Sequence, residues 1–307
     1  MTNNVLISGI TGFVGSNLFN YLKEDYKVQG VSRKTTNELI SYDALDRDIL
    51  NTNKAFIHLA GKAHDLKNTT KENEYFDINF ELTKKVFDKF LKSGCEVFIF
   101  MSSVKAVADE VEKELTEYHN PNPITAYGKS KLAAENYILS KEVPRNKRVY
   151  ILRPCMIHGP NNKGNLNLLY NFVAKGIPYP FGKYENCRSF LSIGNLCFVL
   201  KELLENENIP SGIYNVADDD PLSTKDLVLN IGAAIYKDVK ILNLPKFMFG
   251  VLGKIGDILP FPIDSEKIHK LTGNYVVANK KLKEVLKKKL PLSVEEGIHL
   301  TIKSFTK

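Results

Sequence analysis

The sequence predicts an α/β protein in which a doubly wound parallel sheet is followed by a smaller C-terminal α+β lobe. Over the first 160 residues, short apolar runs alternate with segments of helical periodicity, the pattern of parallel strands joined by right-handed crossovers. A glycine-rich turn at residues 9–15 directly follows the first of these runs. Near residue 161 the pattern changes to short helices, proline-rich turns and isolated strands, so we place the start of the second lobe there.

Five apolar runs are short and rich in β-branched or aromatic residues, as buried strands are. They lie at residues 5–8, 27–32, 55–59, 96–101 and 149–152. Three segments with apolar residues at three- and four-residue spacing are predicted helices, at residues 13–23, 72–92 and 125–140. Strands at residues 188–193 and 212–216 are expected to return to the first lobe. The predicted division is therefore 1–160 together with 187–217, and 161–307.

Composition limits the function classes. The chain has 307 residues, of which 43% are hydrophobic and 25% charged, so it can bury a substantial core. Its net charge of +7 is scattered, apart from a lysine-rich segment at residues 280–289 that has the pattern of a solvated helix face. This distribution argues against nucleic-acid binding and leaves a small anionic ligand open.

Neither a membrane span nor a metal site is predicted. No apolar run reaches the roughly 18 residues that a spanning helix needs, and the start lacks a basic signal region, so we expect a cytoplasmic protein without membrane insertion. The four cysteines form no CxxC pair, and no nearby histidine completes a zinc motif. The apolar segment 247–262 is interpreted as a helical lid or core piece of the second lobe, with a membrane-surface contact as the alternative.

The glycine-rich turn has the spacing and position of a dinucleotide fingerprint. Gly9 permits the tight turn, Gly12 lets the backbone approach a pyrophosphate, and Gly15 lets helix and strand pack closely. Free N–H groups at the helix start bind phosphate well; the alternative is a purely structural turn. The residues expected to contact the cofactor here are Gly9, Thr11, Gly12, Phe13, Val14 and Gly15.

The end of the second strand bears on the choice of cofactor. An acidic residue there binds the adenosine ribose of NAD, whereas a basic residue accommodates the 2′-phosphate of NADP. This chain has Ser32 and Arg33 at that point. NADP(H) is therefore favoured and NAD(H) remains possible, because Arg33 could equally be a solvent-exposed loop residue.

A tyrosine and a lysine four residues apart begin the third predicted helix. Tyr127 and Lys131 share one helix face, and a phenol needs a nearby cation to act as an acid or base at neutral pH. The preceding strand ends at Ser102 and Ser103, whose hydroxyl groups could hydrogen-bond the same substrate oxygen. The spacing alone is common, but its position after this strand and the glycine turn indicates a catalytic group.

Together these motifs resemble the extended short-chain dehydrogenase/reductases, specifically the nucleotide-sugar epimerase/dehydratase family, over essentially the whole chain. The matching pieces are residues 9–15, His58-Leu59-Ala60-Gly61, Asn79, Ser102-Ser103, Tyr127 with Lys131, Leu152-Arg153-Pro154, Gly159-Pro160 and Arg188-Ser189-Phe190. The resemblance implies a Rossmann fold whose first lobe binds NAD(P) and whose second lobe binds a nucleotide sugar. It also implies a homodimer formed through helices 72–92 and 125–140.

The resemblance also implies roles for individual residues. Ser103 would be the catalytic hydroxyl, Tyr127 the acid/base and Lys131 its partner, with Ser103 and Tyr127 touching substrate. Cofactor contacts are implied for Ser32, Arg33, Asp43, Leu59, Ala60, Gly61, Asn79, Lys131 and Pro154. Further substrate contacts are implied for Asn165 and for Arg188, the latter at the nucleotide diphosphate.

Several of these residues have a structural alternative. Asp46 competes with Asp43 for the adenine position, Asn79 could satisfy backbone groups in its helix, and Arg188 could pair with a surface carboxylate. His58 is expected to be a packed strand-end residue without a chemical role.

The expected chemistry is oxidation or reduction at C4 of a UDP-hexose. Dehydration is disfavoured because Val104 occupies the position of an aspartate in the dehydratase motif. The segment around Ser103 resembles 4-ketoreductases of UDP-2-acetamido-2,6-dideoxyhexuloses used for surface polysaccharides, and with Arg33 it favours reduction. The alternative is 4-epimerisation of UDP-glucose or UDP-N-acetylglucosamine. A non-catalytic dinucleotide sensor is a further alternative, which the presence of both Tyr127 and Lys131 disfavours.

Overall fold

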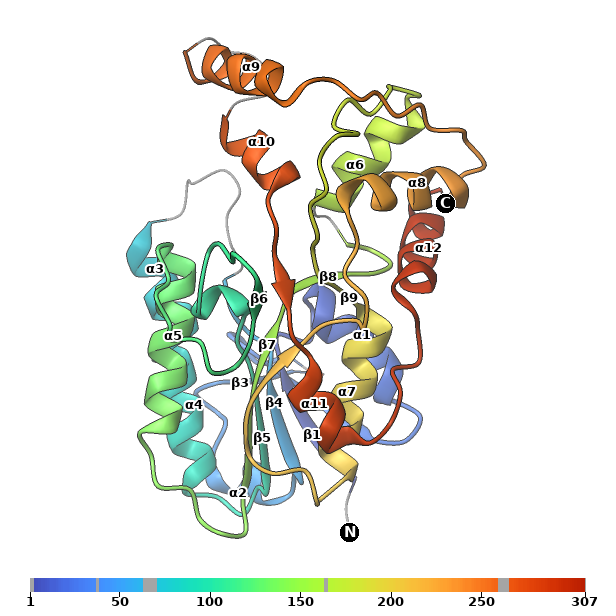
Figure 1. Ribbon diagram of the computed structural model, residues 1–307. Helices are drawn as coiled ribbons and strands as arrows, with labels where there is room; N and C mark the ends of the chain where they lie inside the picture. Colours follow the sequence, from blue (N-terminus) through green and yellow to red (C-terminus); the bar gives the residue numbers. More distant parts are fainter. Residues whose placement is uncertain (1–2, 37–38, 63–70, 163–164, 259–264, 307) are drawn as a thin grey trace.

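A seven-stranded parallel sheet forms the centre of the molecule, which confirms the predicted fold class (Figure 1). The computed structural model describes residues 3–36, 39–62, 71–162, 165–258 and 265–306, without the side chains of residues 165, 252, 253, 255, 256, 258, 266, 267 and 270. The strand order is β10-β7-β5-β4-β1-β2-β3. The strands are β1 Asn4–Ser8, β2 Lys27–Ser32, β3 Leu39–Ser41, β4 Ala55–His58, β5 Val97–Met101, β7 Arg148–Pro154 and β10 Gly212–Val216.

Alternate residues of the strands face two separate apolar layers. On one side, Val5 and Ile7 contact the layer of α1 (Phe13–Leu22) and α7 (Ile193–Glu205). On the other side, Leu6 contacts the layer of α4 (Leu82–Leu91) and α5 (Ala126–Leu139). Figure 1 shows α5 and α7 on opposite sides of the sheet. The sequence did not predict β3 or the short helix α2 (Arg47–Asn51).

The predicted helix at residues 72–92 is interrupted. It consists of α3 (Glu72–Phe76), a π-helical turn at Asp77–Glu81 and α4. The π-helical turn contains the buried Asn79. Such turns often occur at functional sites because they redirect a side chain without ending the helix.

The second half of the chain forms a separate apolar cluster. Its helices are α6 (Asn165–Ala174), α8 (Thr224–Ala234), α9 (Lys246–Ile258), α10 (Ser265–Thr272) and α12 (Val294–Phe305). The helix α11 (Lys280–Leu286) instead lies beside β10, with Leu282 and Leu286 buried and Lys283 exposed, as the lysine-rich pattern predicts. The division of the chain at residue 161 stays a prediction.

The two strands predicted within residues 187–217, β9 and β10, belong to different sheets. β10 joins the central sheet beside β7, whereas β9 (Phe190–Ser192) pairs with β8 (Met156–His158) in a two-stranded parallel sheet. β9 thus lies outside the central sheet, because its partner β8 has also left that sheet, whereas β10 belongs to it. The return of residues 187–217 to the first lobe stays a prediction. A further two-stranded sheet joins β6 (Glu114–Leu115) to β11 (Val276–Val277).

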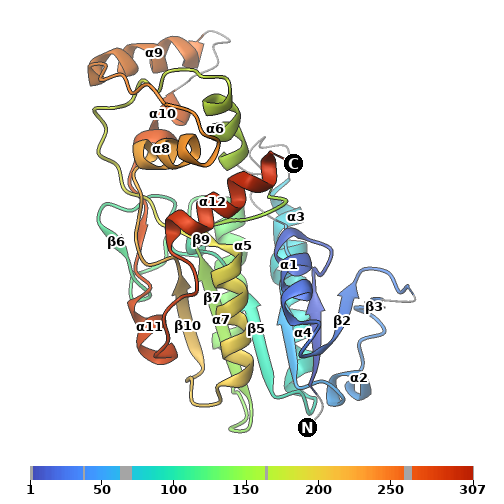
Figure 2. The ribbon, with the colours of Figure 1, turned by 90° about the vertical axis from the view of Figure 1, so that its right-hand side faces the viewer.

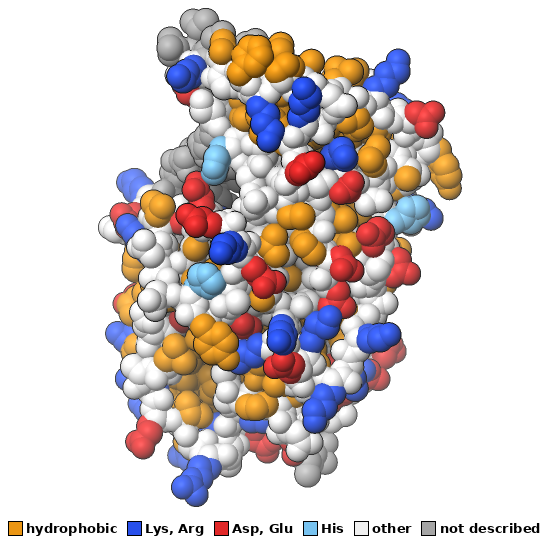
Figure 3. Space-filling model, viewed as in Figure 1, with side chains coloured by type: hydrophobic (Ala, Val, Ile, Leu, Met, Phe, Trp, Pro, Cys, Tyr) orange, Lys and Arg blue, Asp and Glu red, His pale blue; other side chains and the backbone are white. Residues whose placement is uncertain are grey.

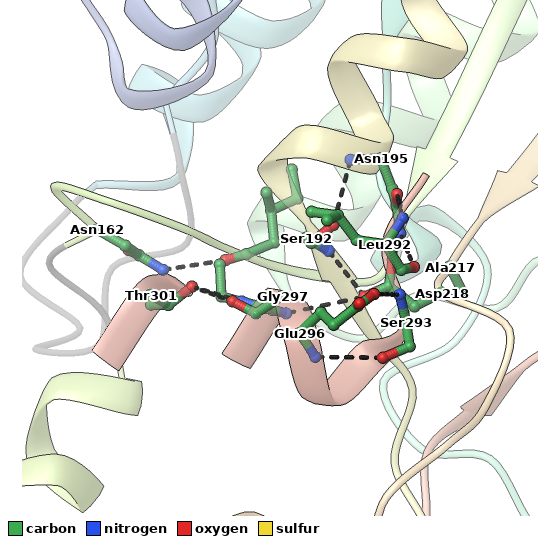
Figure 4. A network of polar contacts seen from close by, with 12 residues as sticks. Asn162, Ser192, Asn195, Ala217, Asp218, Leu292, Ser293, Glu296, Gly297 and Thr301 are labelled. Carbon is green, nitrogen blue, oxygen red and sulfur yellow. Dashed lines mark hydrogen bonds and ion pairs between the residues drawn. The ribbon is translucent and has the colours of Figure 1, made fainter. Parts of the chain in front are cut away.

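A buried polar network holds these returning segments together (Figure 4). Asp218, just after β10, accepts hydrogen bonds from the Ser192 amide at 2.9 Å and the Asn195 side chain at 2.7 Å. Asn195 in turn pairs with the backbone of Leu292, at 2.9 and 3.0 Å. The following residue, Ser293, caps α12 in a reciprocal capping box. The Asp218 carboxylate thus binds the start of α7 directly, and Asn195 links it to the start of α12.

Candidate active site

The glycine-rich turn has a conformation that side chains would prevent. Gly9 has φ +72°, in the left-handed region, and a β-carbon there would lie 2.8 Å from the Ala60 amide nitrogen. A β-carbon on Gly15 would overlap the Gly9 carbonyl oxygen. Gly12 occupies the N-cap of α1 and supplies no side-chain hydrogen bond. The amides of the first helical turn therefore remain for a phosphate group, which fits a bound pyrophosphate.

A chain of buried hydrogen bonds fixes the loop that faces this turn. The Ala60 amide donates to Ser8 Oγ at 3.2 Å, and Ser8 Oγ lies 2.7 Å from His58 Nδ1. His58 Nε2 lies 3.0 Å from Thr83 Oγ1, and Thr83 donates to the Asn79 carbonyl at 2.8 Å. Because the Thr83 proton is already used, His58 must donate from Nε2 and accept at Nδ1.

His58 is a neutral, positioning residue in this arrangement. Burial lowers its pKa to about 3, so the ring stays uncharged at neutral pH. His58 is buried at the end of β4, as predicted for a packed strand-end residue. Its hydrogen bonds connect the loop after β4 to the π-helical turn, a connection that no local sequence pattern indicates.

The side chain of Asn79 joins three segments. Its oxygen accepts from the Lys62 amide at 2.7 Å, and its nitrogen donates to the Lys62 carbonyl at 3.1 Å and to Ser130 Oγ at 3.0 Å. A β-carbon on Gly61 would lie 2.9 Å from Asn79 Oδ1 and 3.0 Å from Lys131 Nζ. The predicted cofactor residues Gly61, Asn79 and Lys131 thus lie together. Because Gly61 has no side chain, only its backbone faces the Asn79 side-chain oxygen and the Lys131 ammonium group.

Tyr127 and Ser103 meet where β5 and α5 approach each other. Ser103 follows β5, and Thr125 caps the start of α5 by accepting from the Gly128 amide at 3.2 Å. A β-carbon on Gly128 would overlap the Lys105 carbonyl oxygen, so glycine permits this close approach. Withdrawal from water raises the pKa of Tyr127, and a hydrogen bond with Ser103 opposes that rise.

Lys131 lies one turn further along α5 and is buried. Its ammonium group donates to the Met101 carbonyl at 2.8 Å and lies 4.9 Å from the centre of the Phe100 ring. Burial lowers the pKa of Lys131 to about 8, against the opposing effect of Glu135. The side chain is therefore still mostly charged at pH 7.

A buried ion pair between Glu135 and Arg153 lies next to this site. Glu135, one turn after Lys131, accepts from Arg153 Nε at 3.0 and 3.1 Å and from the Ser102 hydroxyl. The pair holds the ends of β5 and β7 against α5. Pro154, a predicted cofactor contact, directly follows Arg153 at the end of β7. Glu135 was not singled out from sequence, because nothing local shows that its partner lies on another element.

A pocket opens beside Tyr127 and has a volume of about 210 Å³. Its lining residues are Ser103, Val104, Lys105, Tyr127, Cys155, Met156, Arg188, Ser189 and Tyr275. The Arg188 backbone pairs with Leu222, and its Nη1 donates to the Gly273 carbonyl at 3.3 Å. Burial lowers the pKa of Arg188. Tyr127 and Arg188, both predicted from sequence, thus lie on one pocket.

Sequence reasoning missed several lining residues. Lys105 places its ammonium group 4.4 Å from the centre of the Tyr275 ring, and Tyr275 donates to the Ala108 carbonyl at 2.7 Å. Lys105 lies two residues after Ser103 without a motif of its own, and Tyr275 comes from a distant segment. Cys155 and Met156 belong to the same missed set.

At the expected adenosine end, the acidic residues have other partners. Asp43 forms an exposed ion pair with Lys85 at 2.6 Å, and Asp46 caps α2 by accepting from the Ile49 amide at 2.9 Å. Ser32 Oγ donates to the Lys34 carbonyl at 2.6 Å. Neither carboxylate is therefore preorganised for adenine, although an exposed ion pair such as that of Asp43 is weak enough to exchange.

Two further points concern ligands. The side chain of Asn165, a predicted substrate contact, lies outside the described residues. Among the residues that the structure does describe, no group of three or more His, Cys, Asp or Glu side chains could hold a metal ion. Within that same part of the chain, no helix has the length and apolar character to cross a bilayer.

The chain belongs to the NAD dependent epimerase/dehydratase family, whose model matches residues 5–217. It is an NAD(P)-dependent enzyme of the extended short-chain dehydrogenase/reductase type, with activity of the nucleotide-sugar epimerase/dehydratase class. The UDP-glucose 4-epimerase of Vibrio cholerae is 29% identical over 99% of this chain and 96% of the relative. The N-acetyl-alpha-D-glucosaminyl-diphospho-ditrans,octacis-undecaprenol 4-epimerase of Escherichia coli O157:H7 is 28% identical over 82% and 78%.

Solved structures share the fold. The UDP-N-acetylglucosamine 4-epimerase from Bacillus cereus superposes with a TM-score of 0.75 at 21% identity, covering 98% of this chain and 100% of that one. RMD from Pseudomonas aeruginosa, complexed with NADPH, gives 0.74 at 19% identity, covering 99% of each chain. Related folds thus carry epimerases as well as an NADPH-bound protein.

Proposed function

We propose that this enzyme inverts the configuration at C4 of the sugar of a UDP-sugar. The observation that carries the proposal is the pocket itself, which Tyr127, Ser103 and Arg188 all line. Tyr127 and Ser103 suit proton transfer at a sugar hydroxyl, and Arg188 suits a diphosphate. The relatives named 4-epimerases, which match along most of the chain, support inversion as the outcome.

The proposed roles follow from the geometry. Tyr127 takes the proton of the C4 hydroxyl and later returns it, while Ser103 donates a hydrogen bond to the same oxygen. The charge of Lys131, on the same helix face, favours the phenolate. Arg188 binds the diphosphate through charge-assisted hydrogen bonds.

A nicotinamide dinucleotide fits the side of the site that the glycine-rich turn, Asn79 and Lys131 form. The uncapped amides after Gly12 would hold its pyrophosphate, and Lys131 with Asn79 would lie at its nicotinamide end. When bound, the nicotinamide supplies the hydride acceptor and donor for the C4 position. Ser32, Arg33 and Asp43 are proposed contacts at the adenosine end, and Leu59, Ala60, Gly61 and Pro154 are proposed to line the cleft.

A second candidate is the 4-keto reduction of a UDP-2-acetamido-2,6-dideoxyhexulose with NADPH. The observation that favours it is the end of β2, where Ser32 and Arg33 provide no carboxylate for the NAD ribose. Val104 still argues against dehydration, because it lines the pocket without an acidic group. Val104 does not distinguish the reductase from the epimerase, whereas the end of β2 does.

Product analysis separates the two candidates. The purified chain is incubated with UDP-glucose or UDP-N-acetylglucosamine plus NAD, and with a UDP-4-keto-6-deoxy sugar plus NADPH. Formation of the corresponding galacto sugar without net change in absorbance at the NADH wavelength is the expected result. Stoichiometric loss of NADPH with the keto sugar, and no epimer from the first two substrates, would overturn the epimerase in favour of the reductase.

The two parts of the chain are proposed to bind different ligands. Residues 1–160 with 187–217 would bind the cofactor, residues 161–307 would bind the sugar nucleotide, and Asn165 would contact it.

A homodimer through α4 and α5 is proposed as well, and the exposed Leu139 at the end of α5 supports an apolar contact there. Analytical ultracentrifugation of the purified chain tests this assembly.

A further inference from the structure

The helix α9 exposes apolar side chains at the end of the molecule most remote from the central sheet (Figures 1 and 2). Phe247 is 71% exposed, Met248 37% and Val251 55%. The opposite side of the helix is anchored, because the buried Phe249 stacks on Phe181 with ring centres 4.3 Å apart. Of the described apolar side chains in α9, only Phe249 fits the interpretation of this segment as core.

Basic residues surround this exposed face. Between residues 237 and 258 the chain has four exposed lysines and two exposed aspartates: Lys237, Lys240, Lys246, Lys254, Asp238 and Asp257. Within α9, Lys254 lies one turn after Val251, whereas the Lys246 ammonium group lies 5.2 Å from the centre of the Tyr184 ring, on the anchored side of the helix. In the upper part of Figure 3, lysine or arginine side chains adjoin apolar ones. Apolar side chains bordered by cations are typical of a helix that lies in the headgroup region of an anionic membrane.

The length of this helix limits how it can meet a membrane. A helix of 13 residues is about 20 Å long, too short to span a hydrocarbon core of about 30 Å. A negatively charged lipid surface would contact both the cationic and the apolar side chains of this face. A second copy of the chain is the alternative occupant, which the light-scattering test below separates from a lipid surface.

We propose that the exposed face of α9, formed by Phe247, Met248, Val251 and Lys254, binds the surface of an anionic lipid bilayer. The segment that follows leads back to the pocket, because α10 contacts α9 and the Gly273 carbonyl after α10 accepts from Arg188. Binding through α9 would hold the pocket near the headgroups.

This location deepens the proposed function. Arg188 recognises a diphosphate whichever group is attached to its far side, so a membrane-held polyprenyl diphosphate sugar would suit the same pocket as a UDP-sugar. The relative from Escherichia coli O157:H7 is named for a substrate of that class. The substrate consequence rests on the proposed function, whereas the membrane contact does not.

Vesicle co-sedimentation of the full chain tests the contact. The vesicles contain either phosphatidylcholine alone or phosphatidylcholine with about a third phosphatidylglycerol. We expect at least tenfold stronger binding to the anionic vesicles. Phe247→Ser with Val251→Ser should reduce this binding at least tenfold, and Lys254→Glu should reduce it severalfold.

A matched control keeps the test specific. Tyr118→Ser with Leu300→Ser removes an aromatic and an aliphatic side chain that are 83% and 49% exposed elsewhere, and should leave vesicle binding unchanged. Turnover of soluble UDP-sugar should be the same in all these variants. Failure of that turnover in the wild type would overturn the proposed function and leave the membrane contact standing.

Two results would overturn the membrane contact. One is equal sedimentation of the wild type with anionic vesicles, with neutral vesicles and without vesicles. The other is an oligomer in light scattering that the Phe247→Ser/Val251→Ser variant loses, since the α9 face would then be a protein interface.

Discussion

The proposed cofactor side and the proposed substrate side of the site differ in the atoms that form their surfaces. On the cofactor side, backbone lies against backbone, and β-carbons on Gly9 and Gly15 would meet main-chain atoms. On the substrate side, the pocket is lined by side chains such as Arg188 and Tyr275, brought together from segments far apart in the sequence. Tyr127 lines the same pocket, and its helix α5 also carries Lys131, which lies beside Gly61.

This difference indicates which properties the chain can change easily. Where main-chain atoms approach this closely, a side chain cannot replace glycine, so the turn on the cofactor side can change little. Side chains on the substrate side can be exchanged without moving the main chain, so specificity can vary there while the chemistry is retained.

The largest expected effect comes from the pocket residue Tyr127. Tyr127→Phe removes only the phenolic hydroxyl and should lower kcat about 1000-fold, because proton transfer at C4 loses its acid/base. Cofactor affinity, measured by fluorescence titration, should remain within about twofold. The matched control is Tyr118→Phe, on an exposed loop. Unchanged turnover of Tyr127→Phe would remove the catalytic assignment.

The second prediction tests the restriction on the cofactor side. Gly15→Ala forces the turn away from α1 and should weaken cofactor binding about 100-fold, with a loss of about 2 kcal/mol in the free energy of unfolding. Isothermal titration and chemical denaturation measure the two effects. Gly250→Ala is the control, since an added β-carbon there meets nothing within 4 Å. Wild-type affinity in Gly15→Ala would contradict the close-approach account.

The smallest effect is expected on the substrate side. Arg188→Gln retains a hydrogen-bond donor and removes the charge, so KM for the UDP-sugar should rise about 20-fold with little change in cofactor affinity. The control is Arg145→Gln, an exposed arginine on a loop. Steady-state kinetics distinguish the variants. A rise in cofactor Kd equal to the rise in KM would contradict the separation of the two sides.

The parts of the site that the sequence could predict are those with local motifs. Gly9, Gly12 and Gly15 follow a strand at a recognisable spacing, and Tyr127 and Lys131 share one helix face. The strands β1, β4, β5 and β7 have largely apolar, buried runs, because both faces of the sheet are covered there.

The remaining parts depend on contacts between distant segments. β3 is three residues long and too short for a periodic pattern, and β9 follows a partner that has itself left the central sheet. Tyr275 reaches the pocket only because its backbone bridges to Arg188. The hydrogen-bond chain through His58 likewise requires Ser8 and Thr83, which lie 50 and 25 residues away. No local pattern encodes these pairings.

A substrate labelled with deuterium at C4 tests the central claim most directly. The enzyme is incubated with UDP-[4-²H]-glucose or UDP-[4-²H]-N-acetylglucosamine, and the C4 position of the sugars is followed by NMR. If inversion occurs at C4 in the pocket beside Tyr127, the galacto product retains deuterium at C4. A galacto product with ordinary hydrogen at C4, or no galacto product from either substrate, would contradict the account.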